Sequence, residues 1–471
     1  MQMVTITKTV GASPPRPARP VSLALRSYVK DAVRAGTEGL VFAVSGGADS
    51  VALAVAGADV AVREKVPYAA AIVDHGMREE SAEEAGIVAA SLREWGVENV
   101  VVLSGRATVG KGGVENAART LRYGLLEDFA RTWGEGLRAE TEGATEDESH
   151  GTAHLLQGRG LPIEDEVATK DEYGMRNLGE SPSQPTVDIL LGHTLDDQAE
   201  TVLLRLGRGS SPRSLAGMRP RTRVGPGLYR GRPLLSLRRR DTESFCSSLG
   251  LTWIDDPTNA LDGPWKDARG KPLPRVAVRH RALPALADAL GQDPVPALGR
   301  VAALLAEDED ALRLLTQQAW EECRVEEGII EDCAEKGEVG VSSLSTMPVV
   351  PPISIRSLAV AASPVVSPTI SVSSPADLMS SPAPFVRFMV DPLLRYPPAI
   401  RRRLYLLAWG IRGKSVPLRP ALSATHLLAV DQLVTNSSSG PRSPIGKQVE
   451  LPGGIRVRRE RQFLVFSQVK P

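Results

Sequence analysis

The sequence contains few cysteines, and they are widely separated. Only Cys246, Cys323 and Cys333 are present among 471 residues, and no two of them have the C-x-x-C spacing. A disulfide framework needs more cysteines, and a zinc ribbon or an all-cysteine iron–sulfur site needs four that lie close together. These classes are therefore excluded. The scarcity of cysteine also favours a reducing compartment.

The chain also lacks a long apolar run and an excess of charge of either sign. No window approaches about 20 uninterrupted apolar residues, so the sequence predicts neither a membrane span nor a membrane partner. Lys and Arg total 56, Asp and Glu total 56, and the net charge is +0. Any affinity for nucleic acid must therefore come from a local basic surface. Hydrophobic residues make up 42%, which excludes wholesale disorder.

Two regions without hydrophobic periodicity divide the chain. Residues 133–186 begin as an acidic, glycine-rich run, and residues 340–385 are dominated by Ser, Pro and Val. These compositions predict a mobile insertion and a disordered linker. The expected segments are a flexible leader (1–20), a first domain (21–245) with its insertion (133–186), a mainly helical region (246–339), the Ser/Pro-rich linker (340–385) and a small C-terminal domain (386–471).

Apolar runs alternate with helical patterns in the first domain. The expected strands are residues 40–44, 68–73, 99–103 and 187–191, and the expected helices are residues 21–34, 51–62, 81–95, 115–133 and 195–206. This alternation predicts an α/β fold with a parallel sheet covered on both faces. In the C-terminal domain, helical patterns at 400–409 and 423–433 precede a strand pair with its turn at Gly453-Gly454, and the last strand is expected at 461–466.

A loop of small residues follows the first expected strand and leads into a helix. Its members are Ser45, Gly46, Gly47, Ala48, Asp49 and Ser50. Small residues allow several backbone N–H groups and a helix N-terminus to converge on an anion, so the loop is expected to hold phosphate. A carboxylate at this place would repel phosphate unless a cation bridges them, so Asp49 is expected to bind Mg²⁺. The alternative is an ordinary glycine turn in which Ser50 caps the helix.

A second acidic cluster follows the fourth expected strand, in the segment that starts at His193 and includes Asp196 and Asp197. Because parallel strands end at one edge of a sheet, Asp197 and Asp49 are expected to flank the same nucleotide and to share Mg²⁺. The alternative is a capping role, since Thr194, Asp196 and Asp197 are ordinary residues for a helix N-terminus.

Basic residues are concentrated in residues 201–240 and near the N-terminus, with a smaller patch at 401–403 and 456–459. Residues 201–240 contain eleven arginines and no Asp or Glu. This pattern predicts a surface that follows RNA phosphates, and the alternative is a solvated face that pairs with the acidic insertion. Near the N-terminus, Lys8, Arg16, Arg19, Arg26 and Lys30 all precede the first acidic residue. The basic start is typical of an organellar targeting segment and equally of a Pro-rich leader, so the expected compartment is cytoplasmic or mitochondrial.

The two acidic loops resemble those of the PP-loop ATP pyrophosphatase superfamily. Val73–Arg78 and Glu115–Tyr123 resemble the second-strand and helix motifs of this superfamily. Arg232–Leu235, Trp253–Asn259 and the run Arg275, Arg279 and Leu283-Pro284 resemble signatures of the tRNA(Ile)-lysidine synthases. Two positions depart from the family pattern. The usual His-His doublet reads His193-Thr194, and the usual Arg-Asn pair reads Arg275-Val276.

The resemblance implies an ATP-dependent ligase. Such an enzyme adenylates the wobble cytidine of an isoleucine tRNA with a CAU anticodon at its ring carbonyl oxygen, and free lysine then displaces AMP. ATP, Mg²⁺, the tRNA and lysine are the implied partners, the helical region 246–339 is expected to bind tRNA or to act as a linker, and we also consider a homodimer. The implied catalytic residues are Asp49, Asp197, Arg119 and Arg279, and His75 and His193 are expected to bind the nucleotide together with the phosphate loop.

Several alternatives remain open. Arg119 and Arg122 lie on one helix face, which is either a cationic aid to catalysis or a solvated basic face. Asp255 and Asp256 are candidates for handling the lysine amine, or they form an Asx-type turn. Another PP-loop tRNA modifier of the 2-thiolation type would be expected to have cysteines near the site. A non-catalytic tRNA-binding member of the fold would have no need of both Asp49 and Asp197.

Overall fold

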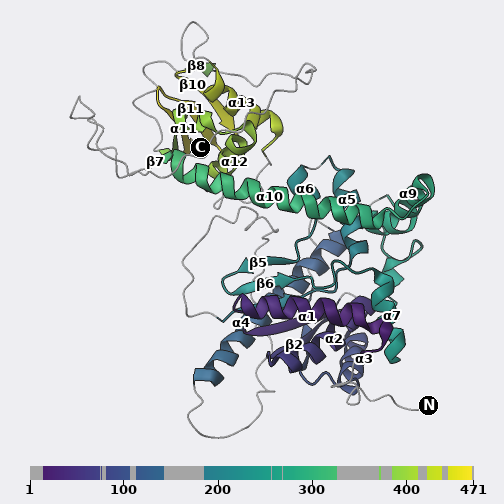
Figure 1. Cartoon of the computed structure of the whole chain (residues 1–471). Helices are drawn as coiled ribbons and strands as arrows, with labels where there is room; N and C mark the ends of the chain where they lie inside the picture. Colours follow the sequence, from purple (N-terminus) through teal and green to yellow (C-terminus); the bar gives the residue numbers. More distant parts are fainter. Residues whose placement is uncertain are drawn as a thin grey trace. The chain divides into compact units, whose positions relative to one another are not determined.

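The computed structural model describes residues 14–74, 76, 81–106, 113–142, 185–209, 211–255, 257–267, 269–325, 371–372, 384–411, 422–436 and 444–468. By internal contacts the chain divides into two compact units, Met1–Glu309 and Asp310–Pro471. Figure 1 labels many of the elements of both units. The two compact units do not test the division of the sequence into five segments, which remains a prediction.

The first unit is built on a six-stranded sheet with the strand order β3-β2-β1-β4-β6-β5. The strands are β1 (Gly39–Val44), β2 (Tyr68–Asp74), β3 (Val100–Ser104), β4 (Val187–Leu190), β5 (Arg221–Gly225) and β6 (Leu228–Gly231). Five of them pair in parallel, and β5 pairs with β6 in the antiparallel direction at the edge. The parallel sheet is confirmed. The sequence did not indicate β5, because its residues alternate arginine with threonine and valine and form no apolar run.

Helices cover both faces of this sheet. The helices up to residue 249 are η2 (Arg16–Ala18), α1 (Arg19–Arg34), α2 (Ala48–Glu64), α3 (Ser81–Glu94), α4 (Gly113–Glu142), α5 (Leu195–Leu206), α6 (Pro212–Leu215) and α7 (Arg239–Leu249). Leu40, Phe42 and Val44 of β1 pack against α1, α2, α3 and α7, whereas Val41 belongs to a second core with α4. This alternation is the period of two that a strand imposes on its side chains.

Helix α4 is longer than the sequence predicts. The acidic composition after Trp133 suggested an early end, but the helix runs to Glu142. Trp133 stacks on Phe129 with a ring-centroid separation of 6.3 Å, and Leu137 lies against the backbone of Gly39. The apolar face of α4 therefore continues along the sheet through the first residues of the expected insertion, and tertiary packing outweighs local composition.

The N-terminal basic residues belong in part to the folded unit. Arg16–Ala18 form a 3₁₀ turn with Ala18 buried, and α1 follows directly. Arg26 and Lys30 of α1 lie 3.5 and 3.7 Å from the carboxylate of Glu64 in α2. These charges serve contacts between helices and so do not support a targeting segment.

A buried ionic network joins α1, β4 and β5 at the beginning of β4. The side chain of Asp188 has an exposed fraction of 0%. It accepts hydrogen bonds from the Tyr28 hydroxyl at 2.6 Å and the Thr37 hydroxyl at 3.0 Å, and two from the Arg221 guanidinium at 2.8 Å each. The same guanidinium lies 3.7 Å from the ring centroid of Tyr229. The carboxylate is thus fully satisfied inside the fold, as a buried charge must be.

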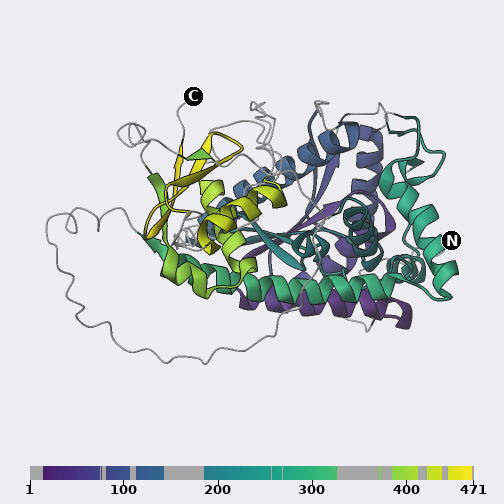
Figure 2. The same ribbon diagram turned by 90° about the horizontal axis from the view of Figure 1, so that it is seen from above.

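The rest of the first unit is mainly helical. The elements are η3 (Pro257–Asn259), α8 (Pro274–Ala277), η4 (Val278–Ala282, a π-helix), α9 (Leu283–Leu290) and α10 (Val295–Cys323), which continues past the end of this unit. Helix α10 is one continuous long helix in the second view (Figure 2). No helix in the part of the chain that the structure describes is both long and apolar enough to cross a membrane.

The second unit contains a six-stranded sheet with the strand order β7-β9-β12-β11-β10-β8. Its elements are β7 (Arg324–Val325), β8 (Ser371–Val372), β9 (Pro384–Met389), α11 (Val390–Arg395), α12 (Pro398–Ile411), α13 (Ala424–Thr435), β10 (Lys447–Leu451), β11 (Ile455–Arg459) and β12 (Phe463–Gln468). The two predicted helices and the strand pair that turns at Gly453-Gly454 are confirmed. Apart from β8 and the start of β9, the Ser/Pro-rich segment 340–385 lies outside the described residues.

Candidate active site

The phosphate loop connects β1 to α2. Gly46 has φ +87°, a left-handed conformation that favours glycine. The Ser50 hydroxyl accepts a hydrogen bond from the Ser45 backbone N–H at 3.1 Å and donates one to the Gly47 carbonyl at 2.9 Å. Gly47, and not Ser50, is the N-cap of α2. Ser50 therefore closes the loop, and the first N–H groups of α2 point out of the helix without intrahelical partners.

Asp49 lies on the first turn of α2. One carboxylate oxygen accepts a hydrogen bond from the Thr242 hydroxyl, and the other lies 3.4 Å from Nε of Arg239. Burial raises the pKa of Asp49 to about 6, even though Thr242 and Arg239 act in the opposite direction. A carboxylate that is hard to ionise without more positive charge is suited to a cation.

Asp197 lies on the first turn of α5 and has two different roles for its two oxygens. One oxygen accepts hydrogen bonds from the Thr194 backbone N–H at 2.8 Å and the Thr194 hydroxyl at 2.9 Å, which is a capping arrangement. The other faces Arg275 at 2.9 Å and Arg239 at 3.3 Å. Burial opposes ionisation, but the charges of Arg275 and Arg239 lower the pKa of Asp197 to about 2. The capping alternative therefore accounts for only one of the two carboxylate oxygens of Asp197.

The structure brings Asp49 and Asp197 together, as their sequence positions indicate. Gly192, just after β4, makes this possible. A Cβ atom there would lie 3.0 Å from the carbonyl group of Asp49 and 3.2 Å from the backbone nitrogen of Ser50. The loop after β4 thus lies directly against the phosphate loop, and both carboxylates contact the guanidinium of Arg239.

Two residues that the sequence prediction missed complete the cluster. Glu200 has an exposed side-chain fraction of 1% and accepts hydrogen bonds from Nε of Arg275 at 2.8 Å and from Nε of Arg279 at 2.6 Å. Arg239 lies 3.9 Å from Glu200 in addition to its contacts with the two aspartates. The spacing from Asp197 to Glu200 places both on one helix face and is a signal that could have found Glu200. No signal in the sequence distinguished Arg239 from the other arginines of the stretch 201–240.

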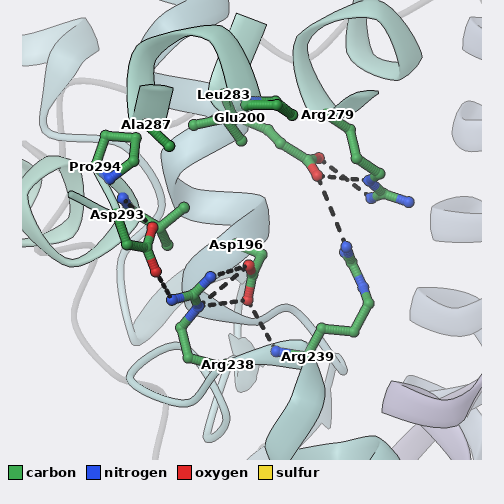
Figure 3. A pocket seen from close by; sticks show the side chains of 11 residues that line it. Asp196, Glu200, Arg238, Arg239, Arg279, Leu283, Ala287, Asp293 and Pro294 are labelled. Carbon is green, nitrogen blue, oxygen red and sulfur yellow. Dashed lines mark hydrogen bonds and ion pairs between the residues drawn. The ribbon is translucent and has the colours of Figure 1, made fainter. Parts of the chain in front are cut away.

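A cavity of about 260 Å³ lies beside this cluster. Its polar lining consists of Asp196, Glu200, Arg238, Arg239, Arg279 and Asp293, and its apolar lining of Leu283, Pro284, Ala287, Pro294 and Val295. Figure 3 shows Arg238 between Asp196 and Asp293, and Arg279 bound to Glu200 on the other side. The cavity therefore offers separate anionic and cationic groups and an apolar wall.

The remaining predicted site residues are distributed unevenly. His193 follows β4, and burial lowers its pKa to about 3, with the positive charges of Arg232, Arg275 and Arg119 acting in the same direction. Arg119 is exposed on α4, and its guanidinium lies 5.0 Å from the ring centroid of Tyr123. His75 lies outside the described residues, as does Asp256. Asp255 is exposed and accepts a hydrogen bond from the Trp253 indole at 3.3 Å.

The basic stretch 201–240 is only in part an exposed surface. Eight of its arginines contact carboxylates or backbone carbonyls of the same unit: Arg205, Arg213, Arg221, Arg223, Arg230, Arg232, Arg238 and Arg239. Arg208, Arg223 and Arg240 are exposed and form no ion pair with a described residue. Arg238 and Arg239 are not free surface cations, because carboxylates from α2, α5 and the segment before α10 pair with them. That the stretch binds RNA stays a prediction.

The carboxylates of Asp49 and Asp197 fit Mg²⁺ together with phosphate. Within the described ranges, no group of three or more His, Cys, Asp or Glu side chains could hold a metal ion by itself. Mg²⁺ is usually bound through one or two carboxylates and the phosphates of a substrate. Two carboxylates at the edge of a phosphate loop are such a set, and Arg239 supplies positive charge between them in this structure.

Comparison with known proteins identifies the family. Residues 21–144 and 182–285 match the PP-loop domain, and residues 388–465 match the TilS substrate binding domain. The tRNA(Ile)-lysidine synthase of Leifsonia xyli is 31% identical over 451 residues, which are 96% of this chain and 92% of that protein. The chain belongs to the tRNA(Ile)-lysidine synthase family.

Two further members of the tRNA(Ile)-lysidine synthase family support this assignment. The enzyme of Nocardia farcinica is 33% identical over 326 residues, covering 69% of this chain and 76% of that protein. The enzyme of Thermobifida fusca is 38% identical over 314 residues, covering 66% of this chain and 75% of that protein. The resemblance drawn from the motifs is confirmed, and membership of the family makes the chain an ATP-using ligase of tRNA modification. The 2-thiolation alternative and the non-catalytic alternative are set aside.

Proposed function

We propose that the chain forms lysidine at the wobble cytidine of tRNA(Ile) with a CAU anticodon, in the site where β1 and β4 end. The single observation that carries this proposal is the convergence of Asp49 and Asp197 on one guanidinium beside the phosphate loop. The two strands are neighbours in the sheet, so both loops reach the same nucleotide.

The phosphate loop and the carboxylates serve the first step, the adenylation of the cytidine carbonyl oxygen. Backbone N–H groups of residues 46–49 and the N-terminus of α2 hold the β- and γ-phosphates, which leave as pyrophosphate. Asp49 and Asp197 would hold Mg²⁺, which neutralises charge on the phosphates when it is bound. The neighbouring guanidinium of Arg239 adds positive charge at the same place.

The cavity next to the cluster is suited to lysine, which has two ammonium groups, one carboxylate and an apolar stem. Arg279 and Arg239 face the cavity and match the carboxylate, while Glu200, Asp196 and Asp293 match the ammonium groups. Leu283, Ala287 and Pro294 provide an apolar surface for the stem. Among these carboxylates Glu200 lies on the same helix face as Asp197, so we assign the reacting amine to it.

In the second step the lysine amine displaces AMP from the activated cytidine. The amine must lose a proton to attack, and a carboxylate within hydrogen-bond reach can accept it. No side chain of the protein has to form a covalent bond with the substrate, because free lysine is the nucleophile. This reaction is tested by pyrophosphate and AMP release with ATP, Mg²⁺ and the CAU tRNA, with and without labelled lysine.

The outcomes of this assay separate the proposed reaction from its alternatives. Turnover that needs both tRNA and lysine, with the label retained on the RNA, is the expected result. Pyrophosphate release that is indifferent to lysine would contradict the lysine step. Binding of the tRNA without release of pyrophosphate would contradict the whole assignment once the protein is shown to be folded.

A further inference from the structure

Beyond the carboxylate cluster, a group of positive charges lies where β4 and β6 end. These strands pair in parallel, and Leu190 of β4 is opposite Gly231 of β6. His193 follows the first strand and Arg232 the second. The guanidinium groups of Arg119 in α4 and Arg230 in β6 lie 5.0 and 4.1 Å from the ring centroid of Tyr123, so two more basic side chains, one from the helix and one from the strand, reach this place.

Arg232 is the least compensated member of this group. Its guanidinium donates hydrogen bonds to the Arg219 carbonyl at 2.8 Å and to the Thr222 hydroxyl at 3.5 Å, and its Nε is buried without a partner. No carboxylate among the described residues forms an ion pair with Arg232 or Arg119. Burial lowers the pKa of Arg232, and the charges of Arg230 and Arg119 lower it further. A half-buried guanidinium whose Nε is shielded from water is favoured by an anionic partner, and none is in place here among the described residues.

The neighbours of Arg232 do not supply that anion. The carboxylate of Glu127 is already paired with Arg230. The carboxylates of Asp197 and Glu200 are already paired with Arg275. His193 adds a buried Nδ1 atom that has no hydrogen-bond partner. Nε of Arg230 is a third buried polar atom without a partner at these adjacent strand ends, and buried polar atoms of folded proteins ordinarily have one. A bound anion would supply it.

We propose that Arg232, together with Arg119 and His193, binds a backbone phosphate of the tRNA next to the reacting cytidine. The inference rests on the proposed function, since that function requires the cytidine to enter this site. The ligand chemistry is a phosphate oxyanion. Arg232 and Arg119 provide its positive charge, and Nδ1 of His193 donates an N–H to it in the tautomer that carries the proton there.

Position in the sheet favours RNA over ATP as the source of this phosphate. The phosphate loop follows β1, and the strand order β1-β4-β6 places Arg232 two strands away. Two strand spacings are about 10 Å. ATP bound at the loop already has its phosphates neutralised there, whereas a cytidine that reaches ATP from the side of β6 must bring its own backbone phosphate past Arg232. A phosphate contact of this kind positions the nucleotide without reading its base.

The test compares Arg232→Gln with Arg131→Gln, a control that removes an exposed arginine of α4. Equilibrium binding of the CAU tRNA is measured over a range of salt without ATP or lysine, and ATP binding is measured separately. For Arg232→Gln we expect about tenfold weaker tRNA binding and a salt slope that is smaller by about one, with ATP binding unchanged. The control should match the wild type in all three measurements.

A second arm locates the phosphate. Single neutral methylphosphonates are placed along the anticodon loop of the tRNA. One position next to the cytidine should weaken binding to the wild type about as much as Arg232→Gln does, and it should add nothing in that variant. Arg232→Lys retains a positive charge and should restore the wild-type salt slope. If the Gln variant does not fold, the Lys variant still tests the phosphate contact.

Three results would overturn the proposal. Weaker ATP binding with unchanged tRNA binding would assign the anion to ATP. Unchanged binding of both ligands would contradict a phosphate site at Arg232. The site would also be contradicted if every methylphosphonate weakened binding to the Arg232→Gln variant as much as it weakens binding to the wild type. Failure of the proposed function is distinguishable, because it appears as wild-type protein that binds the tRNA but attaches no lysine to it.

Discussion

At the scale of single residues, Asp49 shows how the chemistry of the site is prepared by its surroundings. Its carboxylate is held between Thr242 and Arg239 at the edge of the phosphate loop. Burial makes its charge costly until a cation arrives. The nearby Asp197 is ionised far more easily, because Arg275 and Arg239 compensate for its burial. One carboxylate is therefore ready for a ligand, and the other also fixes the start of α5.

Asp49→Asn should reduce pyrophosphate release at least 100-fold and leave tRNA binding within about twofold of the wild type. The substitution removes a charge that would hold Mg²⁺ but no contact with RNA phosphate. Steady-state pyrophosphate release and tRNA binding measure the two effects. Asp59→Asn, which removes a surface carboxylate of the same helix, is the matched control. Full turnover in the Asp49 variant would rule out the metal role.

The same substitution should change how stability depends on pH. The pKa of Asp49 in the folded protein is about 6, above its ordinary value of 3.8, so its ionisation disfavours the folded state by an amount that grows between about pH 4 and pH 6 and is constant above that. This penalty is largest at pH 8 and disappears as the pH falls to 4. Asp49→Asn should therefore raise the free energy of unfolding, relative to the wild type, by about 2 to 3 kcal/mol more at pH 8 than at pH 4. Urea unfolding in EDTA at both pH values checks this difference, and an equal gain at both would contradict it.

Glu200→Gln should raise the KM for lysine about tenfold or more while changing the KM for ATP far less. The variant keeps the shape of the side chain but removes the negative charge that faces the cavity. Glu243→Gln, on the exposed side of α7, is the control. An increase in both KM values to the same extent would show that Glu200 only maintains the fold of the cluster.

The sequence predicted the residues whose positions depend on local pattern. Asp49 and Asp197 follow strands and begin helices, so their place at the strand ends could be derived from strand and helix signals alone. Their partners could not. Arg239 is one of eleven arginines in a short stretch, and which carboxylate an arginine contacts depends on chain segments far away in sequence. The contacts from Arg239 to Asp49 and Asp197 span 190 and 42 positions.

At the scale of elements, the helices and strands of the first unit were predicted where their periodicity is clear. Helix α5 has the predicted bounds, and β1 and β2 differ from the prediction by one residue at an end. The hairpin of β5 and β6 was missed because its residues are mostly arginine, glycine and threonine. Its place in the sheet comes from backbone pairing with β4 and from the contact between Arg221 and Asp188.

Gly192 is the element-scale position on which the site depends most closely. Gly192→Ala should lower kcat about tenfold or more, because its Cβ would press on the backbone of Asp49 and separate the two acidic loops. Gly86→Ala in α3 is the control, since nothing lies within 4 Å of its Cβ, and it should stabilise the protein by up to about 1 kcal/mol. Steady-state kinetics and thermal unfolding of both variants measure these effects. Unchanged kcat in the Gly192 variant would show that the loops adapt.

At the scale of the whole molecule, the affinity for RNA depends on where the charges lie and not on their sum. The net charge is +0, yet the exposed Arg208 and Arg240 lie on the surface without ion pairs among the described residues. The double variant Arg208→Ala with Arg240→Ala should weaken tRNA binding and reduce its salt slope by up to about two, with no change in kcat at saturating tRNA. An unaltered slope would place the RNA surface elsewhere on the protein.

The charge count of the sequence suggested that all three consecutive arginines at 238–240 bind RNA. The structure separates them. Arg238 and Arg239 form ion pairs with Asp196, Asp293, Asp49 and Asp197, and only Arg240 of the three is exposed. Composition can locate a positive region, but it cannot say which of its charges are used inside the fold, because that depends on segments that folding brings near.

The buried network around Asp188 has a consequence for genetics. Arg221 is its only guanidinium among the described residues, so a change at this codon would leave a carboxylate inside the fold without its counter-ion. Such a loss costs several kcal/mol, a large part of the stability of an ordinary domain. Molecules that still fold would retain an intact phosphate loop, since Asp188 is at the opposite end of β4. The phenotype would therefore be one of low protein abundance, and a second mutation elsewhere that stabilises the fold would suppress it.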